Sequence, residues 1–212
     1  IPTLAPYLLP RFLPEFIHEY PTTNLNIREM QSLNIIQALQ EGSIDFAFIV
    51  TPLEEQGLRE IPLFYEPFML YAHPEHSVHQ QQNIRSEDLS PEDLLLLSEG
   101  HCFREQSLNL CQKPGSTEHK GFRYQSGSIE GLKGLVRKNF GFTLVPELSI
   151  EQQIDAPFLK TFHDSAPVRE VSLVCHQSFT KERLLEVLAL FVKNRLPEHF
   201  QTTQTGLRVK WR

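Results

Sequence analysis

The chain has 212 residues, of which 40% are hydrophobic, enough to build one large domain or two small ones around a buried core. Its 20 basic and 26 acidic residues give a formal net charge of −6 without long blocks of one sign, which excludes the usual basic surface for nucleic acid in this segment. No apolar run approaches the roughly 20 residues of a membrane span, and the start lacks a signal-peptide pattern, so a cytoplasmic protein without membrane contact is expected.

The first quarter of the chain alternates helix and strand. Apolar residues at helical spacing predict an amphipathic helix from about Pro10, and Ser32 opens a second helix that Gly42 ends. Between the helices, residues 25–30 alternate like a strand, and residues 44–50 form a nearly continuous apolar strand. The order strand, helix, strand is typical of a parallel sheet.

The rest of the chain continues this α/β pattern. Strands are predicted over residues 58–63, 67–72, 94–97, 122–125, 142–146, 158–162 and 169–175. Ser128 is predicted to cap a helix to about Asn139, and apolar residues over 184–192 form one face of a last helix. The tail from Pro197 is expected to be mobile, with its basic residues in solvent and its single tryptophan without a particular role.

Two of the three cysteines, Cys102 and Cys111, lie nine positions apart in a charged, amide-rich segment. Cys102 follows a predicted strand and precedes a predicted helix, and α/β sheets place functional groups at the carboxyl ends of strands. The N-terminus of a helix favours negative charge, and His101 and Arg104 are able to stabilise a thiolate. A reactive thiol at Cys102 is therefore the first hypothesis.

Helix geometry keeps these two thiols apart. If residues 103–112 are helical, nine residues of rise separate the cysteines by about 13 Å, whereas a disulfide needs Cα atoms about 4.4–6.8 Å apart. Oxidation would have to unwind the helix, and a bond that requires refolding is a switch. The simpler alternative is two unrelated buried thiols, and the third cysteine, Cys175, is assigned to packing.

Four segments carry a resemblance to a known family. They are IPTLAPYLLP (residues 1–10), GSIDFA (42–47), PLFYEP (62–67) and GFTLVP (141–146). These segments resemble the effector-binding domain of LysR-type transcription regulators, and the likeness covers most of residues 1–195. Within that family, the segment GHCFREQ at residues 100–106, followed by Cys111, resembles the members that sense hydrogen peroxide.

The resemblance implies a regulatory domain of two Rossmann-like α/β subdomains with mainly parallel sheets, similar to periplasmic binding proteins and linked by two crossover segments. The first subdomain would hold residues 1–66 and 170–212, and the second, with the redox cysteines, residues 67–169. A winged helix-turn-helix domain that binds promoter DNA would precede Ile1 and be absent here, which agrees with the lack of an initial Met and of a basic surface. The family also implies a homodimer, a tetramer in the full-length regulator, and contact with RNA polymerase.

Individual residues take roles from the same resemblance. Cys102 matches the peroxidatic cysteine, which peroxide oxidises to sulfenic acid, and Cys111 matches the resolving cysteine that closes an intramolecular disulfide. Four further residues match positions that bind peroxide or stabilise the thiolate: Thr3, Ser32, His101 and Arg169. Serine at position 32 departs from the usual threonine but keeps the hydroxyl.

The implied function is a stoichiometric redox sensor rather than an enzyme. A cellular dithiol would reduce the disulfide again, and the refolded segment would change oligomer geometry, DNA binding and transcription activation. Nine histidines without HExxH or CxxC spacing predict no metal site, and no cofactor is expected.

Two alternatives stay open. One is a LysR-type domain that binds a small organic effector in the cleft between its subdomains, with the cysteines incidental. The other, less favoured, is a thiol peroxidase that turns over with an external reductant.

Overall fold

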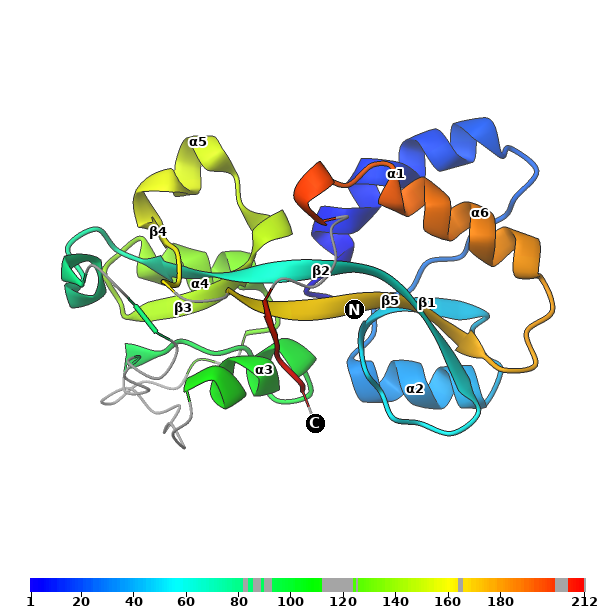
Figure 1. Cartoon of the computed structure of the whole chain (residues 1–212), viewed down its shortest axis with the longest axis horizontal. Coiled ribbons are helices and arrows are strands. Elements are labelled where there is room, and N and C mark those ends of the chain that lie inside the picture. The colour runs from blue at the N-terminus through cyan, green and yellow to red at the C-terminus, as the bar shows by residue number, and fades with distance from the viewer. Residues whose placement is uncertain are drawn as a thin grey trace. The chain divides into compact units, whose positions relative to one another are not determined.

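The computed structural model describes residues 1–81, 84–85, 89, 93–111, 124, 126–163, 166–200 and 206–211, and the chain divides into two compact units. Unit 1 comprises Ile1–Tyr65 and Glu170–Thr203, and unit 2 comprises Glu66–Arg169 and Gln204–Arg212. The chain passes from one unit to the other within two long strands, β2 (Leu58–Ala72) and β5 (Pro167–His176) (Figure 1).

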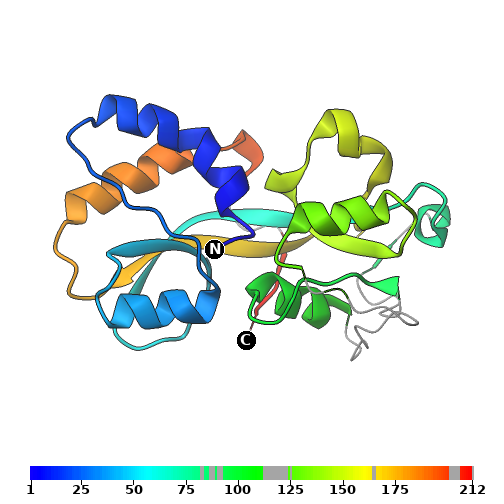
Figure 2. The ribbon, with the colours of Figure 1, turned by 180° about the vertical axis from the view of Figure 1, so that it is seen from behind.

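Unit 1 has helices on both sides of its strands, with α1 and α6 on one side and α2 on the other (Figures 1 and 2). Its elements are α1 (Ala5–Glu19), α2 (Ser32–Gln40), β1 (Phe46–Thr51), α6 (Glu182–Lys193), the 3-10 turn η6 (Glu198–Phe200) and the adjoining parts of β2 and β5. Strand β1 pairs antiparallel with β5, from Phe46 opposite Cys175 to Thr51 opposite Glu170.

Helix α1 forms because its apolar residues recur at helical spacing. Leu8, Phe12 and Phe16 are buried on one face, and the Phe16 ring meets the Phe191 ring of α6 edge-on at 5.3 Å between centroids. The helix begins at Ala5, earlier than the prediction from about Pro10, because Pro6 lies in the first turn, where a missing N–H costs nothing.

Unit 2 packs its helices around antiparallel pairs. Its elements are η1 (Ser77–Gln80), α3 (Cys102–Cys111), α4 (Ile129–Val136), β3 (Phe142–Pro146), η4 (Glu147–Ser149), α5 (Gln152–Asp155), η5 (Ala156–Phe158), β4 (Leu159–Lys160), β6 (Leu207–Arg208) and parts of β2 and β5. Strand β2 pairs antiparallel with β3 from Phe68 opposite Pro146 to Ala72 opposite Phe142, and with β4 at Leu70 and Tyr71.

Several sequence predictions are confirmed. The α/β class, the helix from Ser32 and the helix over the cysteine pair are all present. Gly42, with φ of 69°, follows α2 as predicted, and Ser128 caps α4 by accepting a hydrogen bond from the N–H of Gly131 at 3.4 Å.

The expectation of mainly parallel sheets is wrong. Residues 25–30 form no strand and pair with no neighbour among the described residues, so the parallel partner expected for β1 is missing. The predicted strand over residues 94–97 contributes only one parallel bridge, between Leu94 and Phe142. Among the described residues, β5 and β6 also pair in parallel, while the ladders of β1 with β5, β2 with β3 and β2 with β4 are antiparallel.

Two further strand boundaries differ from the prediction. The two strands predicted over residues 58–63 and 67–72 are one continuous strand, β2, and the strand predicted over 158–162 shrinks to β4. The strand predicted over 122–125 lies outside the described residues, except for Tyr124. None of the helices in the described ranges is both long and apolar enough to cross a membrane.

The tail from Pro197 was expected to be mobile, but its last described residues, 206–211, pack within unit 2. Leu207 and Arg208 pair with Pro167 and Val168, and the N–H of Val209 donates to the carbonyl of Val168 at 2.9 Å. Val209 and Trp211 are 6% and 7% exposed. A backbone ladder and buried apolar side chains hold residues 206–211 in place. The partners in both kinds of contact are distant in sequence.

Candidate functional site

Helix α3 begins at Cys102 and ends at Cys111, and both thiols are free and buried. Nine residues of helical rise separate them by about 13 Å, too far for a disulfide. The buried face of α3 holds few large apolar groups; its members are Cys102, Phe103, Gln106, Ser107, Leu110 and Cys111. A ten-residue helix with so little apolar cover is marginal on its own.

The chain reaches Cys102 through a sharp turn. Gly100 has φ of 87°, a left-handed conformation that glycine adopts without strain, and His101 then precedes the first helical residue. Cys102 is 3% exposed and lies at the positive end of the α3 dipole.

His101 is buried beside Cys102. A Cβ added to Gly127 would lie 3.3 Å from the Nε2 atom of His101, so the absence of a side chain at Gly127 makes room for the ring. Burial lowers the pKa of His101 below its ordinary value, so the neutral imidazole is the dominant form at pH 7. The ring therefore offers one donor and one acceptor rather than a fixed positive charge.

Arg104, which the sequence suggested as a partner of the Cys102 thiolate, has other partners. Its guanidinium donates to the carbonyl of Leu97 at 3.0 Å and lies 3.8 Å from the Glu105 carboxylate. Arg104 thus ties the end of the residue 94–97 segment to the first turn of α3, and its charge is shared with Glu105.

Arg169 lies beside the first turn of α3. Its Cζ atom is 5.6 Å from the centroid of the Phe103 ring, and its Nε and Nη2 atoms donate to Oε2 of Glu66 at 2.8 and 2.7 Å. Both charged side chains are fully buried. Burial raises the pKa of Glu66, the charge of Arg169 opposes that shift, and the N–H of Leu148 donates to Oε1 at 2.9 Å.

Sequence reasoning missed Glu66, although a signal was present. Glu66 follows Tyr65 in the PLFYEP segment and is an acid in the middle of a strand that is otherwise largely apolar. A fully buried acid in such a strand needs a buried cation, and Arg169 is that cation.

Thr3 and Ser32 belong to unit 1, whereas Cys102, Cys111, His101 and Arg169 belong to unit 2. Thr3 precedes α1 and is 2% exposed, and Ser32 is the first residue of α2 and is 1% exposed. Both are buried hydroxyls, a type of group that needs a hydrogen-bond partner.

Cys111 differs from Cys102 in its chemistry. Its side chain is fully buried, and burial raises the pKa of the Cys111 thiol to about 11. Cys111 is therefore a protonated thiol at neutral pH and a poor nucleophile while α3 stands.

A buried polar network elsewhere in unit 2 was not predicted. Asp155 accepts hydrogen bonds from Lys133 at 2.7 Å, from Arg137 at 2.8 Å and from the Tyr71 hydroxyl at 2.8 Å. Burial alone would raise the pKa of Asp155, but these donors and the N–H of Glu151 lower it to about 2. The network ties α4, α5 and β2 together, and no local motif announces it.

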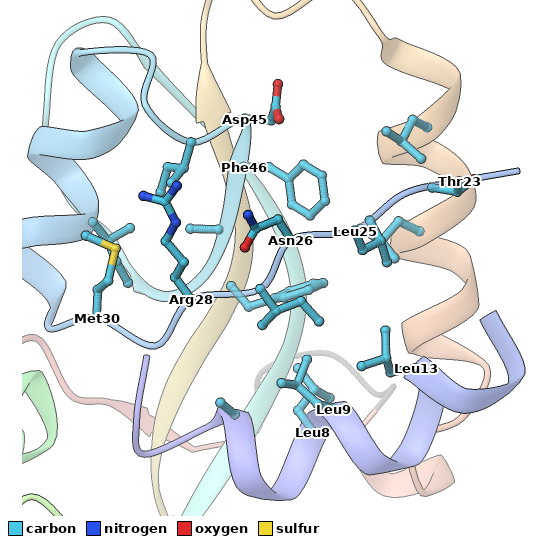
Figure 3. Close-up of a pocket in the computed structure, with 18 of the residues that line it drawn as sticks. Leu8, Leu9, Leu13, Thr23, Leu25, Asn26, Arg28, Met30, Asp45 and Phe46 are labelled. Atoms are coloured by element: carbon cyan, nitrogen blue, oxygen red, sulfur yellow. The ribbon is translucent and has the colours of Figure 1, made fainter. Parts of the chain in front are cut away.

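Unit 1 contains a cavity of ≈ 590 Å³ between α1, β1, α6 and the irregular segment 22–30 (Figure 3). Leu8, Leu9 and Leu13 of α1 line one side, and Phe46 of β1 and Asn26 line another. The size and the mainly apolar lining suit a small organic molecule. Within the described residues, no group of three or more histidine, cysteine or acidic side chains is placed to hold a metal ion.

The chain forms two α/β units and crosses between them twice, and one helix of unit 2 carries two free thiols. The LysR substrate binding domain matches residues 1–197, so the chain belongs to that family, as the sequence resemblance indicated.

Relatives with known names indicate which branch of the LysR family the chain resembles. The chain is 30% identical over 204 residues to the hydrogen peroxide-inducible genes activator of Pectobacterium carotovorum, a match that covers 95% of this chain and 67% of that protein. It is 30% identical to the DNA-binding transcriptional dual regulator OxyR of Escherichia coli K12, with 94% of this chain and 66% of that protein covered. The chain thus spans about two thirds of the length of these curated relatives.

Solved structures agree with these relatives. The crystal structure of OxyR from Porphyromonas gingivalis superposes with a TM-score of 0.87 at 34% identity and covers 99% of this chain and 96% of that one. The reduced form of the same protein gives a TM-score of 0.83 at 32% identity, with 97% and 96% covered. The prediction of an OxyR-like branch of the LysR family is confirmed by these similarities.

Proposed function

We propose that this chain is the redox-sensing regulatory domain of a LysR-type transcription regulator that responds to hydrogen peroxide. The observation that carries the proposal is the placement of Cys102 and Cys111 at the two ends of one marginal helix. The names of two relatives, a hydrogen peroxide-inducible genes activator and the transcriptional dual regulator OxyR, support the same assignment.

The first step is oxidation of Cys102. Its thiolate attacks one peroxide oxygen, the O–O bond breaks, and the leaving hydroxide takes a proton to form water, which leaves Cys102 as a sulfenic acid. Thr3, Ser32 and the neutral ring of His101 supply hydroxyl and imidazole groups to bind the peroxide oxygens and deliver that proton. Arg169 supports the thiolate from beside Phe103, although Glu66 shares its charge.

The second step is resolution by Cys111. Its thiol condenses with the sulfenic acid, an S–S bond forms and water leaves. The helix keeps the two thiols too far apart to bond, so α3 would have to open before Cys111 reacts. The raised pKa of the buried Cys111 thiol supports Cys102 as the cysteine that reacts first. A cellular dithiol would then reduce the disulfide and restore the helix.

The energetics suit a two-state switch. In the chain-entropy model, closing a ten-residue loop restrains the opened segment by about 2–3 kcal/mol. A ten-residue helix with little apolar cover is marginal on its own, so a restraint of this size is large enough to matter. The disulfide can therefore select between two folds of residues 102–111, and the change would alter oligomer geometry, DNA binding and contact with RNA polymerase in the whole regulator.

Peptide mapping after substoichiometric peroxide tests the proposal. We expect a Cys102–Cys111 disulfide that a dithiol removes, while Cys175, fully buried in β5, remains a thiol and serves as the internal control. Cys102→Ser should not consume peroxide at the parent rate. The proposal is lost if the disulfide does not form, and sustained turnover with a dithiol at ordinary enzyme rates would indicate a peroxidase instead.

The cavity in unit 1 favours a second candidate, a domain that responds to a small organic effector. Saturable binding that is unchanged in Cys102→Ser and Cys111→Ser variants, together with no effect of peroxide on the protein, would select this candidate.

A further inference from the structure

The last described residues, 206–211, lie along α3 in both views of the ribbon (Figures 1 and 2). Two side chains of α3 hold this C-terminal segment by its backbone. Nε2 of Gln106 donates to the carbonyl of Val209 at 2.7 Å, and Nδ2 of Asn109 donates to the carbonyl of Lys210 at 2.9 Å. Positions three apart share one face of a helix, so both amides point to the same edge of α3.

The other edge of the segment is fixed to β5. Leu207 and Arg208 pair parallel with Pro167 and Val168. Gly206 allows this close approach, because a Cβ at that position would lie 2.0 Å from the carbonyl oxygen of Ala166. Residues 206–211 thus lie between β5 and α3.

The contact at Gln106 is incomplete. The carbonyl of Val209 can only accept, so the Gln106 amide must turn its nitrogen toward it. Its Oε1 atom is then buried without a hydrogen-bond partner among the described residues. A buried carbonyl without a hydrogen bond costs free energy. The unsatisfied Oε1 atom therefore lowers the stability of the helical form of α3.

Both amides lie between the two cysteines in sequence. Gln106 and Asn109 keep their positions only while residues 102–111 are helical, and a Cys102–Cys111 disulfide requires the helix to open. Opening α3 therefore removes both side-chain hydrogen bonds to residues 206–211 in one event.

We infer that residues 206–211 form a redox-dependent clasp on α3, which the side chains of Gln106 and Asn109 hold in the reduced state. The inference rests on the proposed function and deepens it: oxidation releases the clasp, and the clasp in turn opposes oxidation. The second half follows from the reciprocity of coupled equilibria, since a contact made only in the reduced state stabilises that state.

Trp211 reports on the clasp directly. It is the single tryptophan of the chain and is 7% exposed in the reduced state. Peroxide should move its fluorescence emission to longer wavelength as the indole becomes hydrated, and a dithiol should restore it. Cys102→Ser should show no shift, which excludes direct oxidation of the indole as its cause.

Two variants test whether the clasp opposes formation of the disulfide, and neither changes a cysteine. Asn109→Ala removes one hydrogen bond at an exposed site, and Gly206→Ala forces residues 206–211 away from β5. The equilibrium constant for the Cys102–Cys111 disulfide, measured in a dithiol/disulfide buffer, should rise roughly two- to tenfold in Asn109→Ala and at least as much in Gly206→Ala. The reduced Gly206→Ala chain should already show the long-wavelength emission.

Gln37→Ala is the matched control, because this helical glutamine of unit 1 bonds only its neighbour Glu41 at 2.7 Å in the described contacts. Its equilibrium constant should equal that of the parent. A disulfide that forms while Trp211 emission stays constant, or a Gly206→Ala chain that matches the parent in emission and equilibrium, would overturn the clasp. Failure of the disulfide itself would instead overturn the proposed function.

Discussion

Arg169 donates two hydrogen bonds to a single carboxylate oxygen of Glu66, and neither side chain is exposed. This pair lies in unit 2 next to the ring of Phe103, one residue after Cys102. The geometry makes the two charges dependent on each other, because either one alone would be a buried charge without compensation.

Replacing Glu66 should therefore destabilise unit 2. We expect Glu66→Gln to lower the free energy of unfolding by about 3–5 kcal/mol, since the guanidinium of Arg169 keeps its charge in the core. Chemical denaturation followed by Trp211 emission, which reports on unit 2, measures the loss. Glu15→Gln removes an exposed ion pair with Arg195 and should cost at most about 1 kcal/mol. Equal losses in the two variants would contradict this account.

Cys111 should resist alkylation in the folded, reduced chain. Its thiol is fully buried with a pKa raised to about 11, so at pH 8 both access and ionisation oppose reaction. Mass mapping after a short treatment with iodoacetamide should find Cys111 unlabelled at pH 8, and labelled once the chain is unfolded in denaturant. Rapid labelling of Cys111 in the native chain would show that α3 opens without oxidation.

Stability should depend on pH through Asp155. Its pKa is about 2 in the folded chain and near 3.8 otherwise, so the unfolded chain binds the proton first and stability falls as pH falls from about 4 to 2. The linked contribution is roughly 2 kcal/mol. Asp155→Asn should be less stable than the parent at pH 6 and should lack this acid-dependent loss. A parallel pH dependence in the parent and the variant would refute the assignment.

The stability of the folded chain should also depend on pH through His101. Because burial lowers its pKa, the unfolded chain takes up the proton first, and stability should decline as pH falls through about 6.5. His101→Gln keeps a neutral donor and should flatten that decline. Under the proposed function it should also slow oxidation of Cys102 by about tenfold or more, measured by trapping the sulfenic acid.

Local signals in the sequence predicted the features that local physics decides. The helix from Cys102, the glycine turn before it, the stop at Gly42 and the cap at Ser128 each depend on residues a few positions apart. The resemblance supplied the family and the cysteine roles. The position of Cys102 at a helix start could therefore be predicted, and the structure agrees.

Features that depend on distant partners could not be predicted. Residues 25–30 alternate like a strand, but a strand needs a paired edge, and the segment borders a cavity instead. The two strands predicted over residues 58–63 and 67–72 are one strand, β2, which contains Pro62 and Pro67; proline is tolerated in a strand at positions where the ladder needs no N–H. The tail has no local signal, since its partners Gln106 and Val168 are far away in sequence.

The division of the chain into interrupted units also bears on how the protein is made. Unit 1 is complete only after its second segment, Glu170–Thr203, has been synthesised, and unit 2 waits longer still, for residues 206–211. On a ribosome that translates from the N-terminus, α3 therefore emerges roughly a hundred residues before the backbone carbonyls that Gln106 and Asn109 bind. For that interval residues 102–111 lack their contacts with residues 206–211, so the nascent chain should be more open to thiol oxidation than the finished protein.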